Sequence, residues 1–100
     1  MTASVLLNEI AGLLGEITGE EAEWSAALGP QTRLDGDLFV DSLELAALSD
    51  ALRRRFGRRV DLAGHVADLD LDGIIALSLG DVAALVVARA DPLALPPEPR

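Results

Sequence analysis

The hydroxyl group of Ser42 has neighbours suited to covalent chemistry, because it lies in the run Asp41-Ser42-Leu43-Glu44. Asp41 followed three residues later by Glu44 is typical of a capping box, in which the N-cap carboxylate accepts a hydrogen bond from a first-turn amide and the Glu side chain reaches back. A helix beginning at Ser42 would hold the hydroxyl at the surface, beside free amides, where an attached phosphate is stabilised. On spacing alone, the same pattern also fits an ordinary surface serine.

The helix that would position Ser42 is predicted to end at about residue 56. Its apolar side chains recur every three or four residues, which places them on one helical face. These residues are Leu45, Leu48, Leu52 and Phe56. Gly57 follows, where a left-handed residue commonly ends a helix. The pattern therefore predicts an amphipathic helix whose first turn carries the hydroxyl.

The apolar periodicity elsewhere predicts an all-α fold. The predicted helices span about residues 4–17, 42–56, 71–77 and 79–90. Thr2 or Ser4 is expected to cap the first, and Ser78 with Asp81 forms a second capping box before the last. Residues 18–36 are interpreted mostly as a loop, with a short helix capped from Thr18 as the alternative. We therefore expect a small irregular four-helix bundle with a long first loop and a short third helix.

Side chains outside the long helices are expected to complete the core. Trp24 should clip the first loop onto the bundle. The residues expected to tuck under the start of the second helix are Leu34, Leu38 and Phe39. Those expected to face inward from the last two helices are Ile74, Ile75, Leu77, Val82, Leu85 and Val86. Val60-Asp61-Leu62 is interpreted as an extended linker.

Length and composition limit the classes of function. A chain of 100 residues forms one domain, here expected over residues 1–90, and residues 91–100 hold four of the five prolines and are expected to be a disordered tail. The net charge of −9 argues against nucleic acid, and no cysteine and a single histidine argue against a metal cluster. No stretch approaches the roughly 18 apolar residues of a membrane span, so we expect a cytoplasmic monomer.

The segment over residues 37–56, DLFVDSLELAALSDALRRRF, resembles without a gap the phosphopantetheine attachment segment of acyl carrier proteins, whose core is Asp-Ser-Leu at the start of the second helix. Leu38 and the apolar residues of the helix fall where that family has apolar residues. The resemblance extends to the Ser-Leu-Gly-Asp run before the last helix, and covers about Leu6 to Arg89. It implies the same irregular helical bundle that the periodicity predicts.

The resemblance implies that Ser42 carries 4'-phosphopantetheine, because in this family the Ser oxygen attacks the pyrophosphate of coenzyme A with the help of a phosphopantetheinyl transferase. The chain would then be a carrier rather than an enzyme. Its other partners would be acyl-loading, acyl-transfer or synthase enzymes. The residues expected to meet partners are Asp41, Leu43, Glu44, Ala47, Asp50, Arg53, Arg54 and Val60.

Two departures from the family pattern bear on partner choice. Phe39 stands where many carriers have Gly, which makes the approach to Ser42 bulkier. Arg53, Arg54 and Arg55 replace residues that are largely acidic in fatty-acid carriers. The arginines favour polyketide or other secondary metabolism over fatty-acid synthesis.

Two alternatives stay open beside the acyl carrier. The first is a peptidyl or aminoacyl carrier, although many peptidyl carriers have Gly-Gly-His or Gly-Gly-Asp before the serine, where this chain has Phe39, Val40 and Asp41. The second is a helical interaction module that is never modified and binds a protein through its acidic face.

Overall fold

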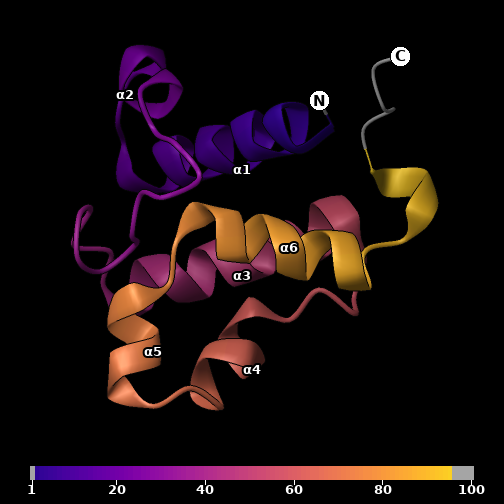
Figure 1. The fold of residues 1–100 in the computed structure, drawn as a ribbon. Coiled ribbons are helices and arrows are strands. Elements are labelled where there is room, and N and C mark those ends of the chain that lie inside the picture. The colour runs from indigo at the N-terminus through magenta and orange to yellow at the C-terminus, as the bar shows by residue number, and fades with distance from the viewer. Residues whose placement is uncertain (1, 96–100) are drawn as a thin grey trace.

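The chain folds as an all-helical globule, as predicted. The computed structural model describes the backbone of residues 2–95 and the side chains of residues 5–95. Within these residues the α-helices are α1 (Thr2–Thr18), α2 (Ala22–Ala26), α3 (Ser42–Phe56), α4 (Leu62–Ala67), α5 (Leu71–Ala76) and α6 (Leu79–Arg89). A 3-10 helix, η1 (Pro92–Ala94), follows α6 (Figure 1).

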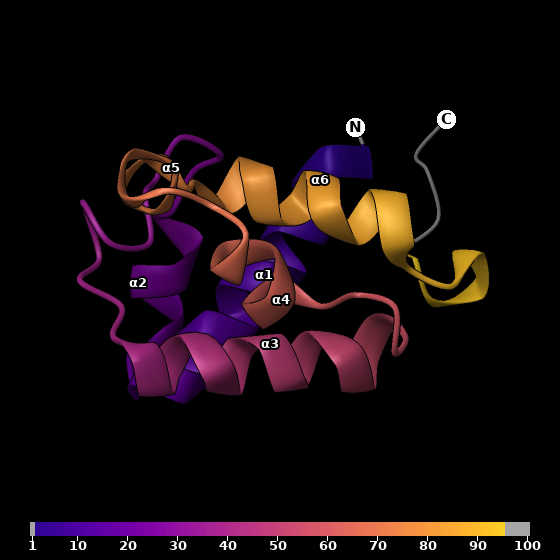
Figure 2. The same ribbon diagram turned by 90° about the horizontal axis from the view of Figure 1, so that it is seen from below.

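Three long helices enclose the core, because α1 packs against both α3 and α6. The short helix α4 packs against α3 and lies between α3 and α6 when the molecule is seen from below (Figure 2). The fully buried side chains at helical spacing include Leu6, Ile10 and Leu14 of α1, Leu48, Leu52 and Phe56 of α3, and Val82 and Val86 of α6. The periodicity that predicted these helices therefore also identifies their inward faces.

The prediction of an extended linker through Leu62 is wrong, because Leu62–Ala67 forms α4. Asp61 is its N-cap and accepts a hydrogen bond from the Gly64 amide at 3.0 Å. Leu62 and Val66, one helical turn apart, are both buried. The buried Ser49 of α3 accepts a hydrogen bond from the Ala63 amide at 3.0 Å, which ties the two helices together. The expected bundle of four helices thus gains α4 between its second and third members.

The ends of α1 and the start of α2 also differ from expectation. Because α1 already includes Thr2 and Ser4, neither occupies the N-cap position. Thr18 ends α1, donating its hydroxyl to the Leu14 carbonyl at 2.9 Å, and therefore does not cap α2. Trp24 of α2 packs against the core, which confirms its predicted role in holding the first loop.

The first residues of the proline-rich tail contact the end of α3. The Asp91 amide donates to the Phe56 carbonyl at 2.9 Å, and Arg55 donates to the Ala94 carbonyl at 2.9 Å. These two hydrogen bonds place η1 against the end of α3. The rest of the expected tail, residues 96–100, lies outside the described residues.

The inward face of α5 is narrower than predicted. Leu77, which follows the helix, is buried and Ile74 packs against the core, but Ile75 is 39% exposed. Leu85 of α6 is only partly buried. Both corrections have the same cause, which is that these residues lie at the edges of their helical stripes.

We expect Leu48→Ala to lower the free energy of unfolding by about 2–5 kcal/mol, because it opens a cavity in a fully packed core. Leu85→Ala should lower it by clearly less, since part of that side chain already faces solvent. Chemical denaturation of both variants measures the difference. Equal losses would contradict the packing described above.

Candidate functional site

The first turn of α3 carries Ser42, and Asp41 and Glu44 set its geometry. The Asp41 Oδ1 atom accepts a hydrogen bond from the Glu44 amide at 2.7 Å, and Glu44 Oε1 accepts one from the Asp41 amide at 3.1 Å. The Leu45 amide donates to the Asp41 carbonyl at 2.9 Å as the first bond of the helix. This confirms the predicted capping box and makes Ser42 the first helical residue.

The surroundings of Ser42 fit an attached phosphodiester. Its side chain is exposed, and its hydroxyl has no hydrogen-bond partner among residues 2–95. The amides of Ser42 and Leu43 likewise find no acceptor in that part of the chain, since the capping carboxylate takes the Glu44 amide. Free amides and the positive end of a helix dipole favour a negative charge at this position.

The loop before α3 is held by its own hydrogen bonds. The Val40 amide donates to the Leu34 carbonyl at 2.9 Å, and the Leu34 amide donates to the Leu77 carbonyl at 3.0 Å. Asp37 accepts a hydrogen bond from the Arg33 amide at 2.8 Å and pairs with its guanidinium. The hydrogen bond from the Arg33 amide and, to a smaller extent, the contact with the Arg33 guanidinium hold the pKa of the Asp37 carboxyl below its usual value. The approach to Ser42 is therefore a fixed turn.

The start of α6 is anchored to the same long loop. The Gly80 amide donates to the Pro30 carbonyl at 2.8 Å. A Cβ atom at position 80 would lie 2.8 Å from that carbonyl oxygen, so only glycine fits without a shift. The capping box of Ser78 and Asp81 is present as predicted, with the Asp81 amide donating to Ser78 Oγ at 3.1 Å. The long loop is thus fastened at both α3 and α6.

A cavity of about 360 Å³ opens beside Ser42. The walls of this cavity include Leu34, Val40, Leu45, Val66, Ile74 and Leu77, and Asp35, Asp41 and Ser42 also line it. Val66 belongs to α4 and Ile74 to α5, so the cavity lies between the first turn of α3 and two short helices. No pattern in the sequence indicated this cavity, because α4 was not among the predicted helices. The signal for α4 itself was present in Asp61, followed by Leu62 and Val66 one turn apart.

Most residues expected to meet partners lie at the surface of α3. Leu43 is 81% exposed, and Ala47 and Asp50 are also exposed. Glu44 is half-buried, since its carboxylate is held in the capping box. The prediction that Val60 meets a partner is wrong, because its side chain is fully buried in the core. Its place after Gly57 resembles a surface linker in sequence, but the chain turns inward there to start α4.

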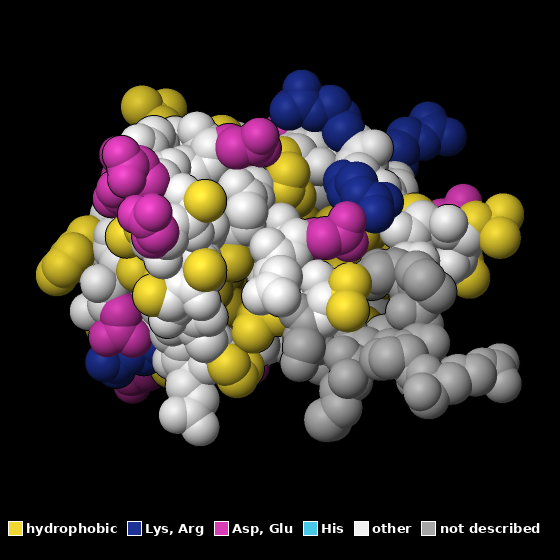
Figure 3. Space-filling view, turned by 90° about the horizontal axis from the view of Figure 1, so that it is seen from above, with side chains coloured by type: hydrophobic (Ala, Val, Ile, Leu, Met, Phe, Trp, Pro, Cys, Tyr) yellow, Lys and Arg dark blue, Asp and Glu magenta, His cyan; other side chains and the backbone are white. Residues whose placement is uncertain are grey.

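The arginines at the end of α3 are paired within the domain. Arg53 lies 3.2 Å from Asp61, the N-cap of α4. Arg54 lies 3.4 Å from Asp50, one helical turn earlier. Both pairs are well exposed, so each contributes little to stability. On the face shown in Figure 3, most of the basic surface gathers toward one edge, and most acidic side chains lie on the opposite half beside a further basic group.

Phe39 does not tuck under α3 as predicted. Its side chain is 80% exposed, although Leu38 and Val40 on either side pack against the core. Its φ of 55° lies in the left-handed region, where a residue other than glycine is uncommon. The turn needs this conformation, so the position suits the glycine that carriers often have there.

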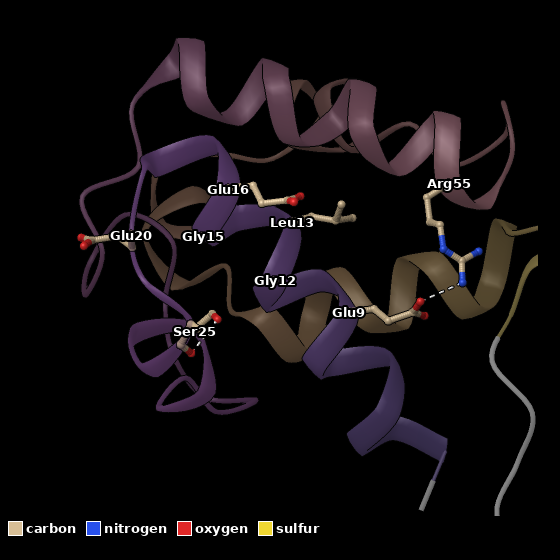
Figure 4. Close-up of a pocket in the computed structure, with 9 residues that line it drawn as sticks. Glu9, Gly12, Leu13, Gly15, Glu16, Glu20, Ser25 and Arg55 are labelled. Atoms are coloured by element: carbon tan, nitrogen blue, oxygen red, sulfur yellow. Dashed lines mark hydrogen bonds and ion pairs between the residues drawn. The ribbon is translucent and has the colours of Figure 1, made fainter.

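A second hollow, of about 380 Å³, lies between α1, α2 and Arg55, and Ser42 does not line it. Figure 4 shows Glu9 directed at Arg55 within it, and their closest oxygen and nitrogen atoms are 2.8 Å apart. Arg55 also binds the Ala94 carbonyl, so this ion pair fastens α1, α3 and η1. Arg55 therefore has a structural role within the domain.

A protein-family model for the phosphopantetheine attachment site matches residues 4–64, which is well over half of the chain. The chain belongs to this family of carrier domains. The match runs from α1 into α4 and includes Ser42, but it does not reach α6, where the resemblance in sequence was also noted. No curated protein and no solved structure matches the chain.

Membership of the family establishes the general chemistry of the carrier domain. Its prosthetic group is 4'-phosphopantetheine, which a phosphopantetheinyl transferase attaches, and the domain presents cargo to biosynthetic enzymes rather than acting as a catalyst. Within the described residues, no helix is long and apolar enough to cross a membrane.

Asp41→Ala should lower the free energy of unfolding by about 0.5–2 kcal/mol, because the Glu44 amide loses its acceptor. Asp41→Asn should retain most of that stability, since an amide oxygen also caps a helix. Thermal and chemical unfolding of the pair measure the effect. If the Ala variant were as stable as the Asn variant, the cap would not hold the start of α3.

Proposed function

We propose that this chain is an acyl carrier domain in which Ser42 bears 4'-phosphopantetheine. The observation that carries the proposal is the position of an unengaged, exposed hydroxyl at the first residue of a capped helix. The other serines with described side chains are engaged. Ser25 donates to the Ala22 carbonyl, Ser49 is buried and accepts from the Ala63 amide, and Ser78 caps α6.

The chain's own residues act by positioning the acceptor oxygen. In the loading reaction Ser42 Oγ forms a bond to the pyrophosphate phosphorus of coenzyme A that carries the pantetheine arm, and the hydroxyl proton passes to a base. The bond from that phosphorus to the bridging oxygen breaks, and adenosine 3',5'-bisphosphate leaves. The free amides of Ser42 and Leu43 favour the negative charge of the resulting phosphodiester. When attached, the prosthetic group supplies a terminal thiol that holds cargo as a thioester.

The cavity beside Ser42 supports an acyl cargo over an aminoacyl one. Its walls are formed mainly by aliphatic side chains from the loop before α3 and from α3, α4 and α5. Burial of an alkyl chain against such walls is favourable by about 0.8 kcal/mol for each methylene, whereas a charged ammonium group would lose hydration there. A peptidyl or aminoacyl carrier is the alternative that this argument disfavours.

The arginine-rich end of α3 supports polyketide or other secondary metabolism as the pathway. Arg58 and Arg59 are exposed and form no ion pair within the described residues, in addition to the exposed Arg53 and Arg54. Such a cluster suits a partner with acidic side chains, because complementary charge steers association. We propose that a pathway enzyme binds this end of α3 through acidic side chains.

Incubation with coenzyme A and a broad-specificity phosphopantetheinyl transferase should add one phosphopantetheine, as measured by intact mass. Ser42→Ala should receive none, while its melting midpoint stays near that of wild type because Asp41 makes the cap. Ser78→Thr is the matched control, since it keeps a hydroxyl cap on α6, and it should load normally. Absence of loading in wild type would favour the unmodified interaction module, and loading of Ser42→Ala would place the site elsewhere.

Arg54→Glu should leave loading unchanged and alter stability by less than about 1 kcal/mol, because its pair with Asp50 is exposed. Acyl transfer by the protein's own pathway enzyme should become slower and lose salt dependence. Arg54 is a better choice than Arg53, whose partner Asp61 caps α4. Asp50→Asn is the control for loss of the pair alone, and unchanged transfer by Arg54→Glu would return the arginines to a structural role.

A further inference from the structure

The side chain of Phe39 contributes nothing visible to the stability of the domain. It is 80% exposed, and only its neighbours Leu38 and Val40 pack against the core. Its amide donates to the Asp35 carbonyl at 3.1 Å, a bond that any residue except proline would make. The turn therefore depends on the backbone at this position and not on the ring.

The backbone at Phe39 makes the ring harder to explain by folding. A φ of 55° crowds the Cβ atom of any residue except glycine, and asparagine tolerates it better than bulky residues do. An aromatic residue here is therefore strained and also exposes a large apolar surface to water. Both effects are unfavourable in the isolated domain, so the ring needs an explanation outside it.

The ring lies close to the attachment serine. Three peptide units separate the Cα atoms of Phe39 and Ser42, so these atoms are at most about 11 Å apart. A stable protein interface covers about 800 Å² on each partner, which is wide enough to include both residues. Leu43, 81% exposed, follows Ser42 directly. Two exposed apolar side chains thus flank the hydroxyl in sequence.

We propose that Phe39, together with Leu43, is an apolar anchor that the phosphopantetheinyl transferase buries when it engages Ser42. This inference rests on Ser42 being the attachment site. The transferase is the partner chosen because it must bring a phosphorus atom within bonding distance of Ser42 Oγ. A pathway enzyme has to reach only the far end of a long arm, so its contact with the carrier does not have to cover the residues beside Ser42. Buried aromatic anchors commonly dominate the energy of such interfaces.

The charges around the anchor define the chemistry of the surface that receives it. Asp35 is exposed and forms no ion pair in the described part of the chain, and Asp41 is exposed beside Ser42. Both lie within four residues of Phe39 in sequence. The matching surface on the transferase is therefore an apolar pocket with basic side chains at its rim.

The test is the steady-state kinetics of loading, with the carrier as the varied substrate. Phe39→Gly should keep or raise the melting midpoint, because it relieves the left-handed strain, yet kcat/KM should fall roughly tenfold, mainly through KM. Phe39→Asn tolerates the same φ with less freedom than glycine and should show the same loss. Phe39→Tyr keeps the ring and should load like wild type. Leu93→Ala, which removes an apolar side chain 95% exposed on η1, should have no effect.

The possible results separate this inference from the proposed function. Loading of wild type with kcat/KM of Phe39→Gly and Phe39→Asn within twofold of it would overturn the anchor and leave Ser42 as the attachment site. The same result with slower acyl transfer by a pathway enzyme would assign the ring to that enzyme, and would also overturn the inference. Failure of wild type to load at all would overturn both.

Discussion

The hydrogen bond from the Glu44 amide to the Asp41 carboxylate, 2.7 Å long, fixes the residue at which α3 begins. Because the cap uses Asp41, the next residue, Ser42, keeps its hydroxyl free at the most positive end of the helix. A start one residue later would make Ser42 the cap and engage its oxygen, as happens to Ser78 before α6. The same local motif therefore gives a structural serine at one helix and an available one at the other.

The rest of the domain holds this turn in place. Leu48, Leu52 and Phe56 bury the inner face of α3. The loop before α3 is bonded to the residue that follows α5, through the Leu34 amide and the Leu77 carbonyl. The helices α4 and α5 complete an apolar cavity beside the hydroxyl. These contacts hold Ser42 in a fixed turn beside an apolar cavity, which is the setting that the proposed attachment of a cargo-bearing arm requires.

Much of this arrangement could be predicted from the sequence, since capping boxes and helical periodicity are local signals. They located α3, α6 and the inward faces of the long helices. The failures were residues whose environment depends on distant contacts. In sequence, Val60 and Leu62 resemble a linker, but α4 packs on Ser49 and both residues are buried. Phe39 resembles a core residue, but its left-handed backbone directs the ring outward. The cavity depends on those contacts as well, so no local pattern predicts its volume or its walls.

The central claim is that Ser42 alone bears the prosthetic group. The most direct test is fragmentation mass spectrometry of the wild-type protein after loading, which assigns the added mass to a residue. The account predicts that all of it maps to Ser42 and none to Ser25, Ser49 or Ser78. Added mass on any of those residues would contradict the claim, because their hydroxyls are engaged in hydrogen bonds that the fold requires.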